Sequence, residues 1–408
     1  MEHQQLIPHL FRTEYRKITS VLCKLFGIEH IEIAEDIASE TFLAAVETWS
    51  YKGLPPNPTA WLYAVAKNKA KNHLTHHSIF NDKVAGKIAG ADSLVSEIEI
   101  DWSEHNITDS QLQMLFAICH PVISPESQIG LALRILCGFG IDEIADAFLT
   151  NKDLINKRLF RAKEKLRLEK IPIEFPGVTE IDNRLQNVAT TLYLLFNEGY
   201  YSESKDALVR KDLCLEAMRL TYLLLENEQT SQPSIHALMA LMCFYSSRFD
   251  ARKNENGEMI LYQDQDENLW NDELISRGIH FLHKASTGDR ISKYHMEASI
   301  AYWHTIKADT PEKWERILQL FNQLLSIEYA PVAALNRTYA YSKVYGKAAA
   351  IEEAEKLNLK ENRFYFALLG ELYKDIDNFK SKMNFRRALA LAKTQTDRQT
   401  IQKQIDKL

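Results

Sequence analysis

Helical periodicity is the feature that most constrains the fold of this chain. Apolar residues recur three and four positions apart along almost the whole 408-residue sequence, which is the pattern of amphipathic helices. Strand-like alternation of apolar and polar residues is nearly absent, and glycine (14) and proline (11) are few. The sequence therefore predicts an all-α protein, long enough for two or three domains that each hold a full-sized core.

The charge balance limits how such a protein could bind nucleic acid. The net charge is −6, so any contact with DNA must come from local basic patches rather than from the chain as a whole. The five cysteines are scattered without a CxxC pair, so we expect no disulfide framework, no metal site and no cofactor.

Other classes of protein are also disfavoured. We find no Gly-rich phosphate loop and no acid/base or nucleophile grouping, so we do not expect an enzyme. The N-terminus lacks the apolar core of a signal peptide, and no apolar run approaches membrane-spanning length. We therefore expect a cytoplasmic protein with no membrane partner.

Residues 141–167 predict a helix-turn-helix. Asn151 can cap the second helix, because its amide oxygen can accept a backbone N–H at the helix start. The second helix has a buried stripe of Ile155, Leu159, Ala162 and Leu166, an opposite face with Lys157, Phe160, Arg161 and Glu164, and Asn156 and Lys163 at the edge of that face. A basic and polar outer face suits a helix that reads the DNA major groove. The alternative is a helical hairpin with a solvated charged face.

The first fifty residues predict two helices. One spans residues 4–26 and is closed by Gly27, and the next spans residues 31–49. The inner stripe of the second contains Ala34, Ile37, Ala38, Thr41, Phe42, Ala45 and Trp49, and its outer face carries Glu32, Glu35, Asp36, Glu40 and Glu47. Such an acidic face is either simply solvated or a docking surface for a basic partner.

A third helix, over residues 59–77, follows a rigid turn in which Asn57 is the expected cap and Pro58 the first helical residue. Trp61, Asn68 and Asn72 share one face, Lys67 and Lys71 lie on an adjoining face with Tyr63, and Lys69 and His73 lie on the other flank. Rings that stack on bases, amides that bond base edges and cations that hold phosphates suit unstacked single-stranded DNA. The alternative is a core tryptophan with solvated lysines.

A stretch without basic residues separates these two predicted DNA readers. Residues 88–133 contain no Lys or Arg, and residues 92–109 contain six acidic side chains. We interpret residues 79–109 as a linker, either functionally acidic or disordered.

These motifs resemble a known family. AEDIASETFLAAVETW (34–49) is similar to the core-polymerase-binding helix of bacterial sigma-70-type initiation factors of the extracytoplasmic-function class, and AWLYAVAKNKAKNHL (60–74) to their promoter-melting helix. Residues 110–168 look like their fourth region. LFAICHPVISPESQIGLALRILCGF (115–139), YLLFNEGYYS (193–202) and the long helical tail resemble the subgroup with a C-terminal tetratricopeptide-like extension.

The resemblance implies four segments: a region 2-like domain (1–78), the acidic linker (79–109), a region 4-like helix-turn-helix domain (110–172) and a tetratricopeptide-like domain (173–408). It implies core RNA polymerase and promoter DNA as partners. The implied roles are polymerase docking for Asp36, Glu40 and Phe42, the melted strand for Trp61, Asn68, Lys69, Asn72 and His73, the major groove for Asn156, Lys157, Phe160 and Arg161, and phosphates for Lys152, Arg158 and Lys163.

The tail predicts stacked helical pairs. Phe366, Leu369, Gly370 and Tyr373 followed by Phe385 and Ala388 approach the tetratricopeptide spacing, and Gly370 would admit the partner helix closely. Such a stack can bind a protein or peptide, so we expect the tail to regulate a sigma factor. Two alternatives are a stand-alone helix-turn-helix regulator with a sensing tail and a helical-repeat scaffold in which the basic helices are incidental.

Overall fold

The computed structural model divides the chain into two compact units, unit 1 (Met1–Leu224) and unit 2 (Leu225–Leu408). Across the described residues the regular elements are all helical and no strand occurs, so the predicted all-α fold is confirmed. The described residues are 2–85, 99–201, 207–252, 260, 262–288, 290–392 and 395–408.

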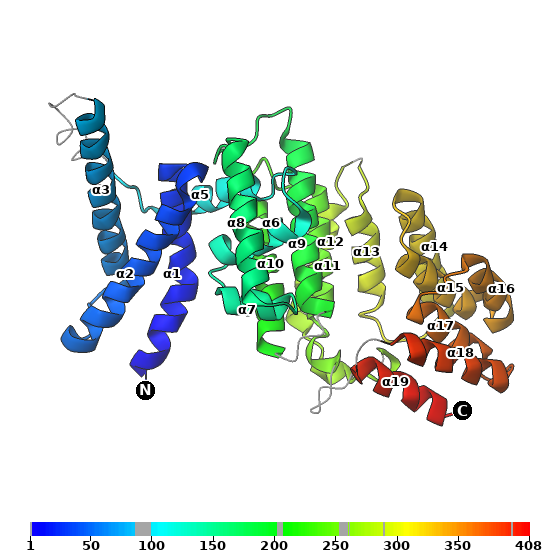
Figure 1. Ribbon diagram of the computed structural model, residues 1–408. Coiled ribbons are helices and arrows are strands. Elements are labelled where there is room, and N and C mark those ends of the chain that lie inside the picture. The colour runs from blue at the N-terminus through cyan, green and yellow to red at the C-terminus, as the bar shows by residue number, and fades with distance from the viewer. Residues whose placement is uncertain are drawn as a thin grey trace. The chain divides into compact units, whose positions relative to one another are not determined.

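Unit 1 is organised around its first helix (Figure 1). Its elements are α1 (Glu2–Phe26), η1 (Ile28–His30), α2 (Ile31–Lys52), α3 (Pro58–Ala85), α5 (Glu104–Ile118), α6 (Pro125–Leu131), the π-helical turn η2 (Ala132–Leu136), α7 (Ile141–Ala147), α8 (Lys152–Leu168), α9 (Ile181–Tyr201) and α10 (Ala207–Leu225). Helix α1 packs against α2, α3, α5 and η2. It therefore holds the predicted melting helix and the helix-turn-helix in one unit.

The helix ends follow the predicted capping residues. Gly27 closes α1 with a φ of +83°, a conformation that favours glycine. The Asn57 side chain accepts the N–H of Ala60 at 3.0 Å where α3 begins, and Asn151 accepts the N–H of Leu154 at 2.9 Å where α8 begins. Local sequence thus determines where these helices begin and end.

The segment boundaries differ from the expected ones. Helix α3 continues to Ala85 and α5 already starts at Glu104, so helices enter the range interpreted as a linker from both sides. Residues 86–98 of that range lie outside the described residues. Helices α9 and α10, expected at the start of the tail domain, belong almost entirely to unit 1.

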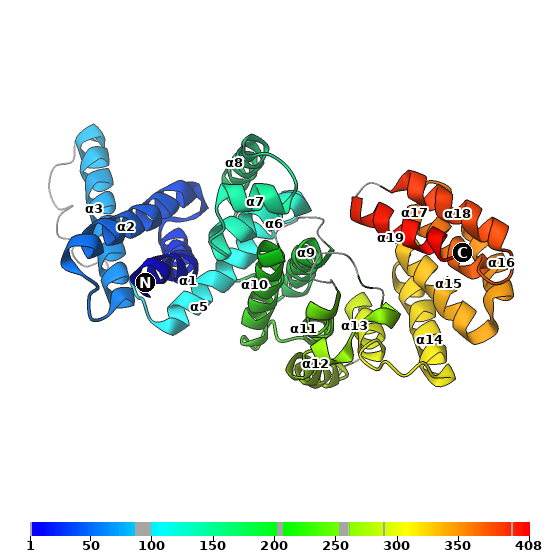
Figure 2. The ribbon, with the colours of Figure 1, turned by 90° about the horizontal axis from the view of Figure 1, so that it is seen from below.

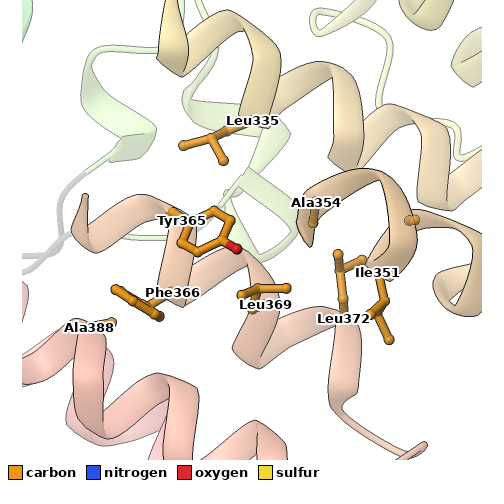
Figure 3. Packing of buried hydrophobic residues seen from close by; sticks show 9 residues of the cluster. Leu335, Ile351, Ala354, Tyr365, Phe366, Leu369, Leu372 and Ala388 are labelled. Carbon is orange, nitrogen blue, oxygen red and sulfur yellow. The ribbon is translucent and has the colours of Figure 1, made fainter. Parts of the chain in front are cut away.

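Unit 2 is a series of helices that pack on their neighbours in sequence. It contains α11 (Pro233–Ser246), η3 (Asp250–Arg252), η4 (Tyr262–Asp264), η5 (Glu267–Leu269), α12 (Asp272–Ala285), α13 (Lys293–Trp303), α14 (Pro311–Ile327), α15 (Pro331–Tyr345), α16 (Lys347–Leu357), α17 (Arg363–Tyr373), α18 (Asn378–Leu391) and α19 (Gln395–Asp406). Figures 1 and 2 both show α17 beside α18. A buried cluster centred on Phe366 and Leu369 of α17 joins α15, α16 and α18 (Figure 3).

The close approach of α18 to α17 depends on Gly370, as predicted. A Cβ atom at Gly370 would lie 2.8 Å from the ring of Phe385, closer than carbon atoms can pack. Ser381 of α18 donates a hydrogen bond to the Gly370 carbonyl at 2.7 Å, which holds the two backbones together.

Replacing Gly370 by alanine should therefore destabilise unit 2. The added methyl group must push the Phe385 ring away, and overpacking of this kind costs about 2 kcal/mol. Denaturant unfolding of the full chain would measure the loss. Gly177→Ala is the control, because a Cβ at Gly177 meets no atom within 4 Å. Equal stability of the two variants would contradict this account of the packing.

Candidate nucleic-acid interface

The predicted single-strand face of α3 is only partly accessible. Asn68 and Asn72 are exposed, and Lys67 and Lys71 are half-buried. Trp61 makes an edge-to-face contact with the buried Trp49 of α2, with the ring centroids 5.3 Å apart. Part of the Trp61 ring therefore packs against the core, as expected for the alternative of a core tryptophan. The side-chain amides of Asn68 and Asn72 face solvent.

The other flank of α3 is tied to neighbouring helices. Lys69 Nζ lies 2.7 Å from Glu40 Oε2 of α2, and the His73 ring packs edge-on against Phe26 of α1 at 5.8 Å. Lys69 was predicted to hold single-stranded DNA and Glu40 to contact polymerase. One cation of the predicted DNA interface and one carboxylate of the predicted polymerase interface therefore neutralise each other.

Tyr63 connects α3 to the segment before α5. Its hydroxyl donates to Glu14 Oε2 at 2.6 Å, and its ring stacks on Trp102 with centroids 4.9 Å apart. Burial and the bond to the Glu14 carboxylate raise the pKa of Tyr63, so the hydroxyl keeps its proton. The end of the predicted linker is therefore anchored on α1 and α3.

The outer face of α8 is open at its N-terminal half. Asn156, Lys157, Phe160 and Arg161 are exposed, and the side chain of Phe160 is 62% exposed although it is a large apolar ring. The predicted inner stripe of α8 is fully buried. A phenyl ring beside an amide and two cations can meet a thymine methyl group and base edges together.

The residues expected to hold phosphates have different surroundings. Lys152 pairs with Asp142 across the turn at 2.5 Å, with both side chains well exposed, so this pair can exchange readily with a phosphate. The Arg158 guanidinium lies over the Phe148 ring at 5.5 Å. Lys163 is ion-paired with Glu35 and only 13% exposed. Lys163 would have to leave this ion pair before it could contact a phosphate, so its contact with DNA stays a prediction.

Two further side chains of α2 are buried. Phe42 packs edge-on against Phe11 at 5.0 Å, in agreement with its place in the predicted inner stripe, and its contact with polymerase stays a prediction. Glu35, placed on the outer acidic face by its spacing, is buried as well. Asp36 and Glu40 remain exposed.

Glu35 joins the two DNA-reading parts. One carboxylate oxygen accepts from Arg134 of η2 at 3.0 Å, and the other pairs with Lys163 of α8. At the same helix interface Arg167 pairs with Glu32 at 2.6 Å and donates to the Glu29 carbonyl at 3.1 Å. The C-terminal half of α8 is therefore fastened to the start of α2.

Helix α10 is held to α1 by ion pairs. Arg12 pairs with Glu143 of α7 at 2.7 Å and also with Asp212 of α10. Arg16 pairs with Glu216 of α10 at 2.8 Å. These contacts and those of Glu35 could not be predicted from the sequence, because the partners are far apart in the chain and no local motif marks them.

Comparison with known proteins shows which family the N-terminal helices match. Residues 10–78, which hold most of α1, the whole of α2 and most of α3, match Sigma-70 region 2. The chain is 33% identical over 385 residues to an uncharacterized protein of Rhizobium meliloti (strain 1021), covering 93% of this chain and 90% of that protein. The chain belongs to the family of that protein. It is of the sigma-70 type at its N-terminus.

A sigma-70 region 2 gives the chain a sigma-factor role in promoter recognition and transcription initiation, with core RNA polymerase and promoter DNA as the implied partners. Residues 184–286 match a family of unknown function (DUF6596), which begins in α9 and ends after α12. No solved structure matches the chain. None of the helices in the described ranges is long and apolar enough to cross a membrane.

Proposed function

We propose that the chain is a sigma factor of the extracytoplasmic-function class whose tetratricopeptide-like C-terminal helices regulate it. Helix α2 docks on core polymerase through Asp36 and Glu40. Helix α3 handles the melted strand through Asn68 and Asn72, and α8 reads the upstream duplex element. The observation that carries the proposal is the open face of α8 in the same unit as a sigma-70 region 2.

The acidic row of α2 supports polymerase docking. Glu32, Asp36 and Glu40 are four residues apart and so lie along one face of the helix. Arg167 of α8 pairs with Glu32, and Lys69 of α3 pairs with Glu40. A basic surface of polymerase that docks on this row would compete with both pairs. Docking would thereby release basic side chains from each of the two DNA-reading helices.

Core binding is tested with purified bacterial core polymerase. Asp36→Arg reverses a charge in the middle of the acidic row and should weaken core binding by about tenfold, since close like charges at an interface cost at least a kilocalorie per mole. Run-off transcription should fall in parallel. Glu361→Arg makes the same charge change at an exposed site in unit 2 and should change neither.

The same assay separates this proposal from a stand-alone helix-turn-helix regulator. A sigma factor binds core and starts transcription while its free affinity for duplex DNA is low, because one small recognition domain makes few phosphate contacts. Wild-type protein that fails to bind core but binds a duplex tightly would overturn the sigma-factor proposal.

The regulatory role of the C-terminal helices is tested by truncation after Leu225. This end point keeps α10, whose Asp212 and Glu216 hold Arg12 and Arg16, whereas truncation at residue 178 would remove them. We expect the transcript yield to change while the truncated protein stays folded. An unchanged yield with unchanged core binding would count against regulation by unit 2.

A further inference from the structure

Two buried cations of unit 2 meet on one aromatic ring. Arg248 follows α11, Lys313 lies in α14, and Tyr262 begins η4. The Arg248 guanidinium carbon and the Lys313 ammonium nitrogen lie 5.4 Å and 5.2 Å from the centre of the Tyr262 ring. Arg248 is 8% exposed and Lys313 is 1% exposed. Charges this deeply buried are costly unless they are paired.

Among the described residues, the immediate contacts of these two cations supply no negative charge. Lys313 Nζ donates to the Ile306 carbonyl at 2.5 Å and to the Tyr262 hydroxyl at 3.0 Å. Arg248 has no ion pair within the described ranges of unit 2, and its buried Nε–H has no acceptor there. The tyrosine ring faces both cations, but a ring quadrupole offsets only part of a buried charge.

The nearby carboxylates are already engaged. Asp309 accepts from the indole N–H of Trp314 and from Lys343 at 3.1 Å. Glu267 lies 3.9 Å from Lys307. Asp309 also attracts Lys313, but it is shared with Lys343, so the positive charges of Arg248, Lys313 and Lys343 exceed the one negative charge of Asp309.

More unpaired polar atoms surround the same ring. The rings of Trp270 and His304 lie 6.2 Å and 5.2 Å from that of Tyr262, and both the indole N–H and His304 Nδ1 are buried without a hydrogen-bond partner in the described residues. The side-chain oxygen of Gln265 is also unpaired. Lys307 donates a hydrogen bond to the backbone carbonyl of Gln265 and so holds this residue in place. Buried polar groups normally have partners, so their concentration at one place indicates a missing one.

The protonation of His304 fits this arrangement. Burial and the neighbouring charges of Arg248 and Lys313 lower its pKa to about 3. The imidazole is therefore neutral near pH 7 and carries one N–H. It can donate a hydrogen bond without adding a further charge.

We propose that Arg248, Lys313, Trp270 and His304 form a binding site for one compact oxyanion group, a phosphate or a carboxylate. The four side chains come from different places in unit 2 and supply N–H donors with two positive charges, which selects an anion with several oxygens and excludes a metal ion. This site, the Tyr262 site, is separate from the DNA-reading residues, all of which lie in unit 1.

Binding is tested by calorimetry on the full chain with inorganic phosphate and with acetate, each against sodium chloride at the same ionic strength. We expect one phosphate or acetate per chain, and the tighter of the two identifies which oxyanion the site prefers. At ten times its dissociation constant the ligand should raise the Tm of the transition that reports unit 2 by about 4 °C.

Variants locate the site. Arg248→Gln and Lys313→Met should each weaken binding at least tenfold, because each removes a charged donor. Without the anion, Arg248→Gln should leave the Tm unchanged or higher, because it removes an unpaired buried charge. A purely structural arginine would give a lower Tm. Arg277→Gln removes an exposed arginine of α12 and should leave both readouts unchanged.

Several results would overturn the proposal. One is the absence of binding by phosphate and acetate beyond the chloride control. Another is anion binding that Arg248→Gln and Lys313→Met leave intact, which would place the anion elsewhere. If Arg248→Gln does not fold, the anion affinity of Lys313→Met and the number of anions bound per wild-type chain still test the proposal. Because none of these readouts uses DNA or polymerase, failure here is distinguishable from failure of the sigma-factor proposal.

Discussion

Replacing Glu35 by alanine is expected to lower the free energy of unfolding of unit 1 by about 3 kcal/mol. The carboxylate pairs with Arg134 and Lys163, whose side chains are 22% and 13% exposed. Without it, two largely buried cations face each other with no anion between them. Breaking a buried ion pair from one side costs more than the pair itself contributes, because the remaining charge stays out of water.

Urea unfolding of the full chain, followed by a signal from unit 1, measures this effect. Glu47→Ala removes an exposed carboxylate from the same helix and should stay within about 0.5 kcal/mol of wild type. Adding Lys163→Met to Glu35→Ala should restore part of the loss, since it removes one of the unpaired cations. A Glu35→Ala protein as stable as the Glu47→Ala protein would rule out the proposed role of the cluster.

The Glu35 cluster also bears on function, because it fastens α8 to α2. If docking of polymerase on α2 frees α8, Glu35→Ala protein should bind core with at least wild-type affinity once its lower stability is allowed for. If the fastened state is itself the one that polymerase binds, core affinity should fall instead. Core binding measured at a temperature where both proteins are folded distinguishes the two.

Replacing Asn156 and Arg161 together by alanine is expected to reduce transcription from the cognate promoter by about 100-fold. Both side chains are exposed on the outer face of α8. Asparagine and arginine make the paired hydrogen bonds that identify adenine and guanine in the major groove, and each such contact contributes roughly 1–3 kcal/mol. At about 1.4 kcal/mol each, in the lower half of that range, two lost contacts amount to about 2.8 kcal/mol, which corresponds to about 100-fold.

This loss should be confined to promoter reading. Core binding and the Tm of the double variant should match wild type, because neither side chain packs in the core. Arg386→Ala, at an exposed arginine of α18, should transcribe normally. Undiminished transcription by the α8 variant would show that α8 does not read the promoter, even if the chain still acts as a sigma factor through region 2.

Local patterns predicted much of unit 1 correctly. The helix-turn-helix, its buried stripe and the caps at Asn57 and Asn151 agree with the structure. Each depends on residues within a few positions of one another, and such patterns constrain the backbone directly. The close approach at Gly370 was predictable for the same reason, since helical pairs of this kind have a regular spacing.

The sequence by itself determined the helical class, the capped helix ends at Gly27, Asn57 and Asn151 and the buried stripe of α8, because these follow from neighbouring residues. Only the tertiary structure decided that Glu35 is buried, that Lys163 pairs with it and that Arg248 and Lys313 lie near one ring. Glu35 lies 99 residues from Arg134 and 128 from Lys163. Helical periodicity predicts that a carboxylate on the polar face of a helix is exposed to solvent. Whether another helix covers that carboxylate depends on how the helices pack, which local periodicity does not specify.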